Sequence, residues 1–150
     1  MTAIVLDYSL SESWNRRVSE FDLPSADEAT LRYRRFLGDI VFKVGDAAFS
    51  ADWGWVPVLD FAVSLRAITA TLVEERGEQQ RFEFTESDAE IVFERDGPLV
   101  RIEASYVPAR AEVSHVDLSL AAERFLARVV QDLERCHPSL AKNGFVTSLS

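Results

Sequence analysis

The sequence predicts an α+β fold, in which an antiparallel sheet of about six or seven strands carries two packed helices. Alternation of apolar and polar residues, the pattern of a half-buried strand, occurs before residue 57 and returns after residue 80. Two other stretches, 57–73 and about 118–136, repeat apolar residues at helical spacing. Because the strands cluster without regular alternation with helices, we expect antiparallel rather than parallel pairing.

The stretch 57–73 is the element around which the rest of the chain is organised. Its apolar face, at helical spacing, consists of Val58, Phe61, Ala62, Leu65, Ile68 and Leu72. Further apolar residues on its flanks make it typical of a core helix that is packed on most sides. Pro57 suits the first turn, where no backbone N–H is needed, and Gly77 is the expected C-terminal cap.

The part of the chain before this helix is predicted to be mostly strand. Expected strands are 4–10, 31–37, 39–44 and 47–50. Residues 14–21 fit either a short helix or a strand, and the strand is preferred, whereas 24–28 is a loop. Gly38 predicts a bulge or bend, and Gly45-Asp46 predicts a two-residue hairpin turn. Residues 51–55 are expected to connect the last of these strands to the helix.

After the central helix, the sequence predicts a meander of strands. Expected strands lie at 82–84, 89–94, 100–106 and 111–115, with turns at 85–88 and 95–98 and a break at Pro108. The apolar face of this sheet should include Ile91, Phe93, Val100 and Ile102.

The second helix, at about 118–136, is expected to begin after an N-cap at Asp117 and to stop before Pro138. Its apolar stripe consists of Leu118, Ala122, Phe125, Leu126, Val129, Val130 and Leu133. The tail from Ala141 is weakly patterned and is expected to fray.

Length and composition indicate a single globular domain spanning residues 1–150. The one cysteine, Cys136, excludes an internal disulfide and favours a reducing compartment. No basic residue precedes the first apolar run, so the N-terminus lacks the form of a signal peptide. We therefore expect a soluble, cytoplasmic protein that does not enter a membrane.

The net charge of −9 is concentrated in residues 74–96, which hold nine acids and three bases. An acidic chain argues against nucleic acid as a ligand, because phosphates require a basic surface. Clustered carboxylates can instead steer a basic protein partner, although a solvated sheet face that prevents aggregation is the alternative. The candidate partner-binding acids are Glu83, Glu86, Asp88, Glu90, Glu94 and Asp96.

Trp53 and Trp55 have two open interpretations. Two tryptophans in a loop can anchor an interface, because tryptophan is enriched at binding hot spots. They can equally cover the end of the helix as part of the core, since tryptophan is usually largely buried.

No motif for metal, cofactor or nucleophilic chemistry is present, so we expect none of these. The only histidines, His115 and His137, lie at opposite ends of the second helix, and no zinc or calcium spacing occurs. Glycine-rich phosphate loops and a Gly-x-Ser-x-Gly elbow are also absent. Cys136, on the last turn of the helix, is interpreted as a partly buried, inert hydrophobe. A chance pair among the 25 carboxylates leaves a hydrolase as an alternative.

The order of elements offers a further clue to function. N-terminal strands precede a mid-chain apolar helix; then come the segment 81–86, a strand–turn–strand at 89–106 and a helix at 118–133. This order resembles that of small bacterial immunity-like proteins grouped with contact-dependent and polymorphic toxin systems. The resemblance implies a non-catalytic protein that binds and neutralises a partner, such as a basic toxin domain.

Three classes of function therefore stand. The first is an immunity-like interaction protein with an acidic face. The second is a small-molecule binding module with a pocket between sheet and helices, lined by Trp53, Trp55 and phenylalanines. The third is a carboxylate hydrolase. The partner's identity and the oligomeric state do not follow from the sequence.

Overall fold

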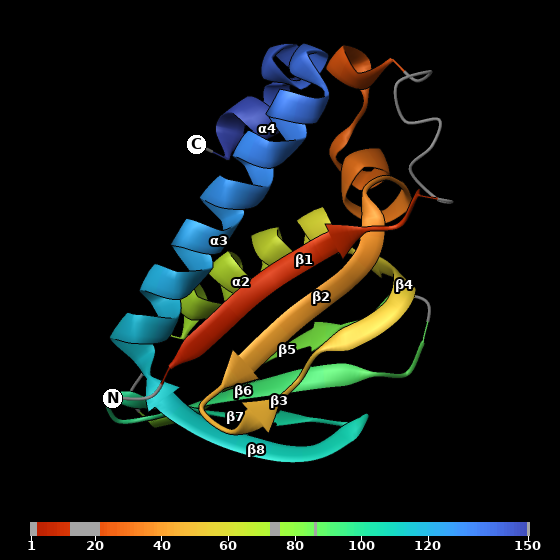
Figure 1. Cartoon of the computed structure of the whole chain (residues 1–150). Helices are drawn as coiled ribbons and strands as arrows, with labels where there is room; N and C mark the ends of the chain where they lie inside the picture. Colours follow the sequence, from red (N-terminus) through yellow and green to blue (C-terminus); the bar gives the residue numbers. More distant parts are fainter. Residues whose placement is uncertain (1–2, 13–21, 73–75, 86, 150) are drawn as a thin grey trace.

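A computed structural model describes residues 3–12, 22–72, 76–85 and 87–149 (Figure 1). Over these residues, two antiparallel four-stranded sheets and two main helices form an α+β fold, which confirms the predicted fold class. The strands that precede the central helix in the sequence form one sheet, and the strands that follow it form the other. Residues 14–21, for which a strand was preferred, lie outside the described residues.

The first sheet is built around its long central strand. Its members are β1 (Ile4–Leu10), β2 (Leu37–Val44), β3 (Ala47–Ala48) and β4 (Ala51–Pro57). β2 pairs with β1 on one side and with β3 and β4 on the other. Gly45, at φ 58°, confirms the predicted hairpin turn, and the register shift between Gly38 and Ile40 confirms the predicted irregularity at Gly38.

Residues 51–55 belong to a strand, β4, so their prediction as a connection was wrong. β4 returns along β2, pairing Ala51 with Ile40 and Pro57 with Leu37. Between these paired ends Gly54 takes φ +79°, a conformation that glycine adopts without strain. The regular alternation that would mark a strand is lost at this position, which is why the sequence pattern missed it.

The second sheet is a meander in sequence order. Its strands are β5 (Arg76–Glu83), β6 (Glu90–Asp96), β7 (Leu99–Ala104) and β8 (Val107–Ser114). The predicted apolar face is confirmed, because Ile91, Phe93, Val100 and Ile102 are all buried. Pro108 lies within β8 rather than breaking it, since an edge strand near its start tolerates a missing N–H.

The two main helices pack along each other, and α2 also contacts both sheets (Figure 1). They are α2 (Val58–Thr71) and α3 (His115–Cys136). Every residue of both predicted apolar faces is buried, and these side chains belong to one hydrophobic cluster with the inner faces of the sheets.

The predicted helix caps were wrong at two ends. α2 ends at Thr71 and is capped by Leu72, whereas Gly77 lies inside β5. α3 begins three residues earlier than expected, because Ser114 is its N-cap and accepts a hydrogen bond from the Asp117 backbone N–H at 3.4 Å. β8 ends at Ser114, so α3 begins directly after that strand. After α2, residue 77 already belongs to β5 and therefore cannot cap the helix.

The strand predicted at 31–37 is instead a π-helical turn, η3 (Thr30–Arg34). Arg32 forms ion pairs with Glu28 one turn earlier and with Asp60 on α2, both at 2.7 Å. Leu31 is fully buried. These contacts require the chain to coil here, and they override the strand-like local alternation.

The C-terminal tail is docked, which corrects the expectation that it frays. A short 3-10 helix, η4 (Pro138–Lys142), leads into α4 (Gly144–Ser148). Between them Asn143 is buried and donates to the carbonyls of Leu23 and Ala26, at 2.7 and 2.8 Å. Its Oδ1 accepts from the N–H groups of Phe145 and Val146 and so caps α4.

Asn143→Ala is expected to lower the free energy of unfolding by about 2 kcal/mol, because it removes a helix cap and a buried donor together. Urea unfolding measures this loss. Lys142→Ala, an exposed neighbour, is the matched control and should change stability by less than about 0.5 kcal/mol. Equal unfolding midpoints for the two variants would contradict the structural role of Asn143.

Candidate binding surface

Trp53 and Trp55 lie on β4, two residues apart, and their rings stack with centroids 5.2 Å apart. Gly54 between them donates its N–H to Asp39 Oδ1 at 2.7 Å, which holds the irregular strand against β2. Both tryptophans are partly buried and pack against the core cluster. The two interpretations from the sequence, a core position and an exposed interface anchor, therefore each hold in part. Both tryptophan side chains pack against the core and leave part of their surface in solvent.

An aromatic cluster joins this tryptophan pair to the second sheet. Trp53 contacts the rings of Phe84 and Tyr106 edge-on, at 4.9 and 5.1 Å between centroids. The Tyr106 hydroxyl donates to the backbone carbonyl of Phe49, and burial raises the pKa of this phenol above its usual value. These contacts fix the tryptophans relative to the turn between β5 and β6.

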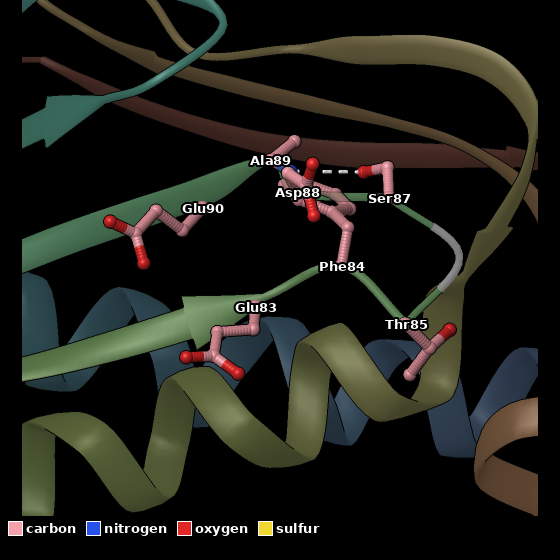
Figure 2. A pocket seen from close by; sticks show the side chains of 7 residues that line it. All are labelled: Glu83, Phe84, Thr85, Ser87, Asp88, Ala89 and Glu90. Atoms are coloured by element: carbon pink, nitrogen blue, oxygen red, sulfur yellow. Dashed lines mark hydrogen bonds between the residues drawn. The ribbon is translucent and has the colours of Figure 1, made fainter.

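Two hollows meet at this place. Trp53 and Trp55, with Ser87 and Ala89, line an apolar hollow of about 510 Å³. An adjoining hollow of about 390 Å³ is lined by Glu83, Phe84, Thr85, Ser87, Asp88, Ala89 and Glu90 (Figure 2). Ser87 and Ala89 line both hollows, so the two adjoin at the β5–β6 turn. Glu83 and Glu90 pair in the register and alternate with Phe84 and Ala89, so they project from the other face of this hairpin. We call Trp53, Trp55, Glu83, Asp88 and Glu90 the aromatic–acidic surface.

The turn between β5 and β6 is tied by its own hydrogen bonds. The Ala89 N–H donates to Ser87 Oγ at 3.1 Å, a bond drawn in Figure 2. The N–H groups of Phe84 and Ser87 donate to the carbonyls of Ala89 and Phe84 at 3.0 and 3.3 Å. The described residues of this turn, Phe84, Ser87 and Ala89, are therefore linked to one another by hydrogen bonds.

The carboxylates of the surface include a like-charge pair. Glu83 and Glu90 are direct partners in the β5–β6 register and lie side by side in Figure 2. Like charges opposite each other on neighbouring strands are destabilising. Arg81 forms an ion pair with Glu90 at 2.9 Å. Within the described part of the chain, no basic side chain forms an ion pair with Glu83 or Asp88, both of which are exposed.

The structure does not bring all the predicted acids together. Glu94 accepts a hydrogen bond from Gln79 at 2.9 Å, and Asp96 forms an ion pair with Arg101 at 2.6 Å. Both lie toward the far end of β6, away from the β5–β6 turn. Glu86 lies outside the described residues. The predicted acidic face thus divides into a paired part and the aromatic–acidic surface.

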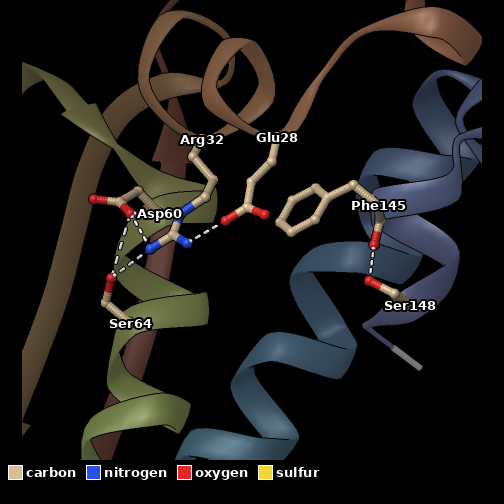
Figure 3. A network of polar contacts seen from close by, with 6 residues as sticks. All are labelled: Glu28, Arg32, Asp60, Ser64, Phe145 and Ser148. Atoms are coloured by element: carbon tan, nitrogen blue, oxygen red, sulfur yellow. Dashed lines mark hydrogen bonds and ion pairs between the residues drawn. The ribbon is translucent and has the colours of Figure 1, made fainter.

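A second polar cluster, which sequence reasoning missed, joins α2 to η3 (Figure 3). Arg32 donates to Asp60 Oδ1 at 2.8 Å and to Ser64 Oγ at 3.1 Å. Burial raises the pKa of the Asp60 carboxyl, and this effect outweighs the opposite effect of Arg32. The signal in the sequence was an acid inside an otherwise apolar helix, because a buried carboxylate requires a partner.

This cluster borders a hollow of about 220 Å³ between α2, η3 and β5. Arg32 directs its donors to Glu28, Asp60 and Ser64, so its guanidinium is committed to contacts within the protein. We interpret the cluster as a structural link that holds η3 on α2.

The remaining residues singled out from the sequence have structural surroundings. His115 Nε2 lies 2.8 Å from the carbonyl oxygen of Thr69, and His137 packs near the Phe36 ring, where burial lowers the pKa of its imidazole. Cys136 is exposed, contrary to expectation, because it falls on the outer side of the last turn of α3.

No group of three or more His, Cys, Asp or Glu side chains in the described part of the chain is placed to hold a metal ion. None of the helices described combines the length and apolarity that crossing a membrane requires.

The fold and the site define an α+β protein with two antiparallel sheets and an aromatic–acidic surface at the rim where they meet. Comparisons of the chain with protein-family models, curated proteins and solved structures found no match. The immunity-like resemblance therefore stays a prediction.

Proposed function

We propose that this protein is a non-catalytic binding protein that docks a basic segment of a partner protein on its aromatic–acidic surface. The observation that carries the proposal is that the Trp53–Trp55 hollow and the exposed carboxylates of Glu83 and Asp88 flank the same β5–β6 turn. Tryptophans supply the binding energy typical of hot spots, and carboxylates supply charge complementarity and a faster encounter. An immunity-like role would make the partner a basic toxin domain.

The pairing of charges differs between this surface and the rest of the same sheet. This difference favours a binding role over the alternative that the acids only keep the sheet face solvated. On β7 and β8, acids alternate with arginines, and Arg101 and Arg110 form ion pairs with Glu112 and Glu103 at 3.1 and 3.3 Å. At the aromatic–acidic surface, two carboxylates oppose each other and the acids outnumber the single arginine, Arg81. A surface selected only for solubility has no need of this arrangement.

Replacing Glu83, Asp88 and Glu90 together by Lys tests the proposal. A partner is first identified by capture on the wild-type protein, and its association is then followed by stopped flow across a salt series. We expect the association rate at low salt to fall by about tenfold or more, because electrostatic steering reverses. The difference should shrink toward 1 M salt, where the Debye length is about 3 Å.

The matched control carries the same change in charge at Asp46, Glu112 and Glu123, all exposed and on other elements. Circular dichroism first establishes that both variants are folded. Equal association rates for the two triple variants would overturn the proposal, because the effect would then come from net charge alone.

A small-molecule binding module is the second candidate, favoured by the tryptophan-lined hollow of about 510 Å³. This volume falls within the range of ligand pockets, about 300–1,000 Å³. The hollow lies at the rim between β4 and the β5–β6 turn, rather than between sheet and helices as expected. Thermal shift in the presence of a small aromatic-ligand library distinguishes this candidate, since it requires stabilisation without any protein partner.

A further inference from the structure

We infer that the outer edge of β5 binds an extended segment of a partner polypeptide as an added strand, through the main-chain groups of Arg81 and Glu83 and the Oδ2 atom of Asp60. The inference goes beyond the proposed function and does not rest on it, because it uses the main chain of β5 and the hollow between α2, η3 and β5. A second copy of this chain fits less well, since it would bring its own α2, packed against its own β5, into the same hollow of about 220 Å³.

Arg81 and Glu83 turn their main-chain groups away from the rest of the sheet. Facing residues on antiparallel strands alternate between hydrogen-bonded and non-hydrogen-bonded pairs. The Phe84 N–H donates to the Ala89 carbonyl, so the β5–β6 register places both Glu83 and Arg81 in non-hydrogen-bonded pairs. Over the described ranges of the chain, the outward N–H and carbonyl groups of these two residues have no hydrogen-bond partner.

The outer edge of the first sheet, by contrast, is capped by side chains. On β1, the outward carbonyl of Leu6 accepts from Arg128 of α3 at 3.0 Å, and the outward N–H of Tyr8 donates to Asp7 Oδ1 at 2.8 Å. Unpaired strand edges promote pairing with other chains, and covering the edge suppresses it. The uncapped part of the β5 edge is therefore suited to strand addition.

The hollow beside this edge has α2 as its other wall. α2 runs alongside β5 (Figures 1 and 2), and the rings of Phe61 and Phe82 pack with centroids 5.2 Å apart. Residues of β5 line one side of the hollow, and Asp60 and Ser64 of α2 line the other. Such a groove suits an added strand, because its main chain pairs with the edge while alternate side chains point toward the helix.

Asp60 supplies the selectivity of this groove. Its ion pair with Arg32 and its hydrogen bond from Ser64 both use Oδ1. Oδ2 points away from Arg32 (Figure 3) and has no partner among the residues that the structure describes. The side chain is 5% exposed, so this acceptor gains from a donor on the bound segment. Because Arg32 already balances the charge, a neutral donor such as a threonine hydroxyl is sufficient.

The test starts from a random heptapeptide library, which is selected on the immobilised full chain. We expect the selected peptides to protect the amides of Arg81 and Glu83 from hydrogen exchange, as measured by NMR. In synthetic copies of these peptides, N-methylation should weaken binding about fivefold at every second residue and have little effect at the residues between. Replacing threonine by valine at the position that faces Asp60 should weaken binding severalfold, because the shape is kept and the donor is lost.

A pair of variants tests the same contact from the side of the protein. Glu83→Pro removes the outward N–H, and no bond to β6 is lost, so an edge strand tolerates it. Glu83→Gln is the matched control, since it removes the same charge and keeps the N–H. We expect about fivefold weaker peptide binding for Glu83→Pro and unchanged binding for Glu83→Gln. Circular dichroism establishes that both variants are folded; if the proline variant is not, the N-methylated peptides decide.

Three results would overturn the inference. The first is that no heptapeptide is selected, or that the selected peptides protect amides outside β5. The second is that N-methylation weakens binding without a two-residue period. The third is a dimer in sedimentation that Glu83→Pro dissociates and Glu83→Gln does not, because the edge would then pair with a second copy of the chain.

Discussion

Gly38→Ala is expected to destabilise the protein by at least about 4 kcal/mol, beyond the usual range for a single substitution. A Cβ at residue 38 would lie 2.0 Å from the Ser9 carbonyl oxygen and 2.8 Å from the Leu10 Cα. Both are backbone atoms of β1, which pairs with β2 through Leu10 and Gly38. No change of side-chain rotamer can relieve the clash, so the two strands must move apart.

Urea unfolding, or the soluble fraction if no folded protein is recovered, measures this effect. The matched control is Gly144→Ala at the start of α4, where an added Cβ meets no heavy atom within 4 Å. That variant should be neutral or slightly more stable, because alanine reduces the entropy of the unfolded chain. Similar midpoints for both variants would contradict the close approach of β1 to Gly38.

Gly38→Ala also has a consequence for the binding surface. Asp39, the next residue, accepts the hydrogen bond from Gly54 that holds the strand between the two tryptophans. If a folded fraction is recovered, its Trp53 and Trp55 emission should resemble that of a more solvated indole pair. The emission is read in a Trp14→Phe background, in which Trp53 and Trp55 are the remaining tryptophans of the chain.

Asp60→Ala is expected to cost about 3–5 kcal/mol, because it leaves the Arg32 guanidinium without its main acceptor. The Arg32 side chain is 17% exposed and that of Asp60 5%, so water cannot replace the lost carboxylate well. Burial alone disfavours the charged carboxyl, as the raised pKa of Asp60 shows, yet removing one partner strands the other charge. Calorimetry should show a melting temperature lower by roughly 10 °C.

Two further variants distinguish the contribution of the Arg32–Asp60 ion pair from that of the neighbouring contacts. Ser64→Ala, which removes one hydrogen bond from the same cluster, should cost only about 1 kcal/mol. Replacing Arg32 and Asp60 together by leucine should recover most of the stability lost in Asp60→Ala, since no charge is left buried. A double variant as unstable as the single one would show that η3 depends on the ion pair for its shape.

The two core helices and several turns were predictable from local sequence. The residues of the predicted faces of α2 and α3 are all buried, because one-sided burial imposes the 3.6-residue period. The Gly45-Asp46 hairpin and the irregularity at Gly38 were also predicted, since glycine in these contexts has few other roles. Burial of one helix face and the geometry of a tight turn each act on a short stretch of chain, so their effects are visible in the local sequence.

The prediction failed where distant residues decide the local conformation. Residues 31–37 alternate like a strand, but the ion pair of Arg32 with Asp60, 28 residues away, belongs to a coiled turn. The tail beyond Ala141 has weak patterning, but Asn143 ties it to carbonyls more than 110 residues earlier. The local pattern of apolar residues does not reveal such contacts, because they join single polar groups that are far apart in the sequence.

For the binding surface, the sequence by itself determined that residues 74–96 are acidic and that two tryptophans lie close together in the chain. Only the tertiary structure decided which carboxylates are paired, because pairing depends on the register of β5 against β6 and of β6 against β7. The same register sets Glu83 opposite Glu90 and Glu94 beside Gln79. The packing of Trp53 on Phe84 then brings the tryptophans to the β5–β6 turn, since that contact joins two parts of the chain that are separate in the sequence.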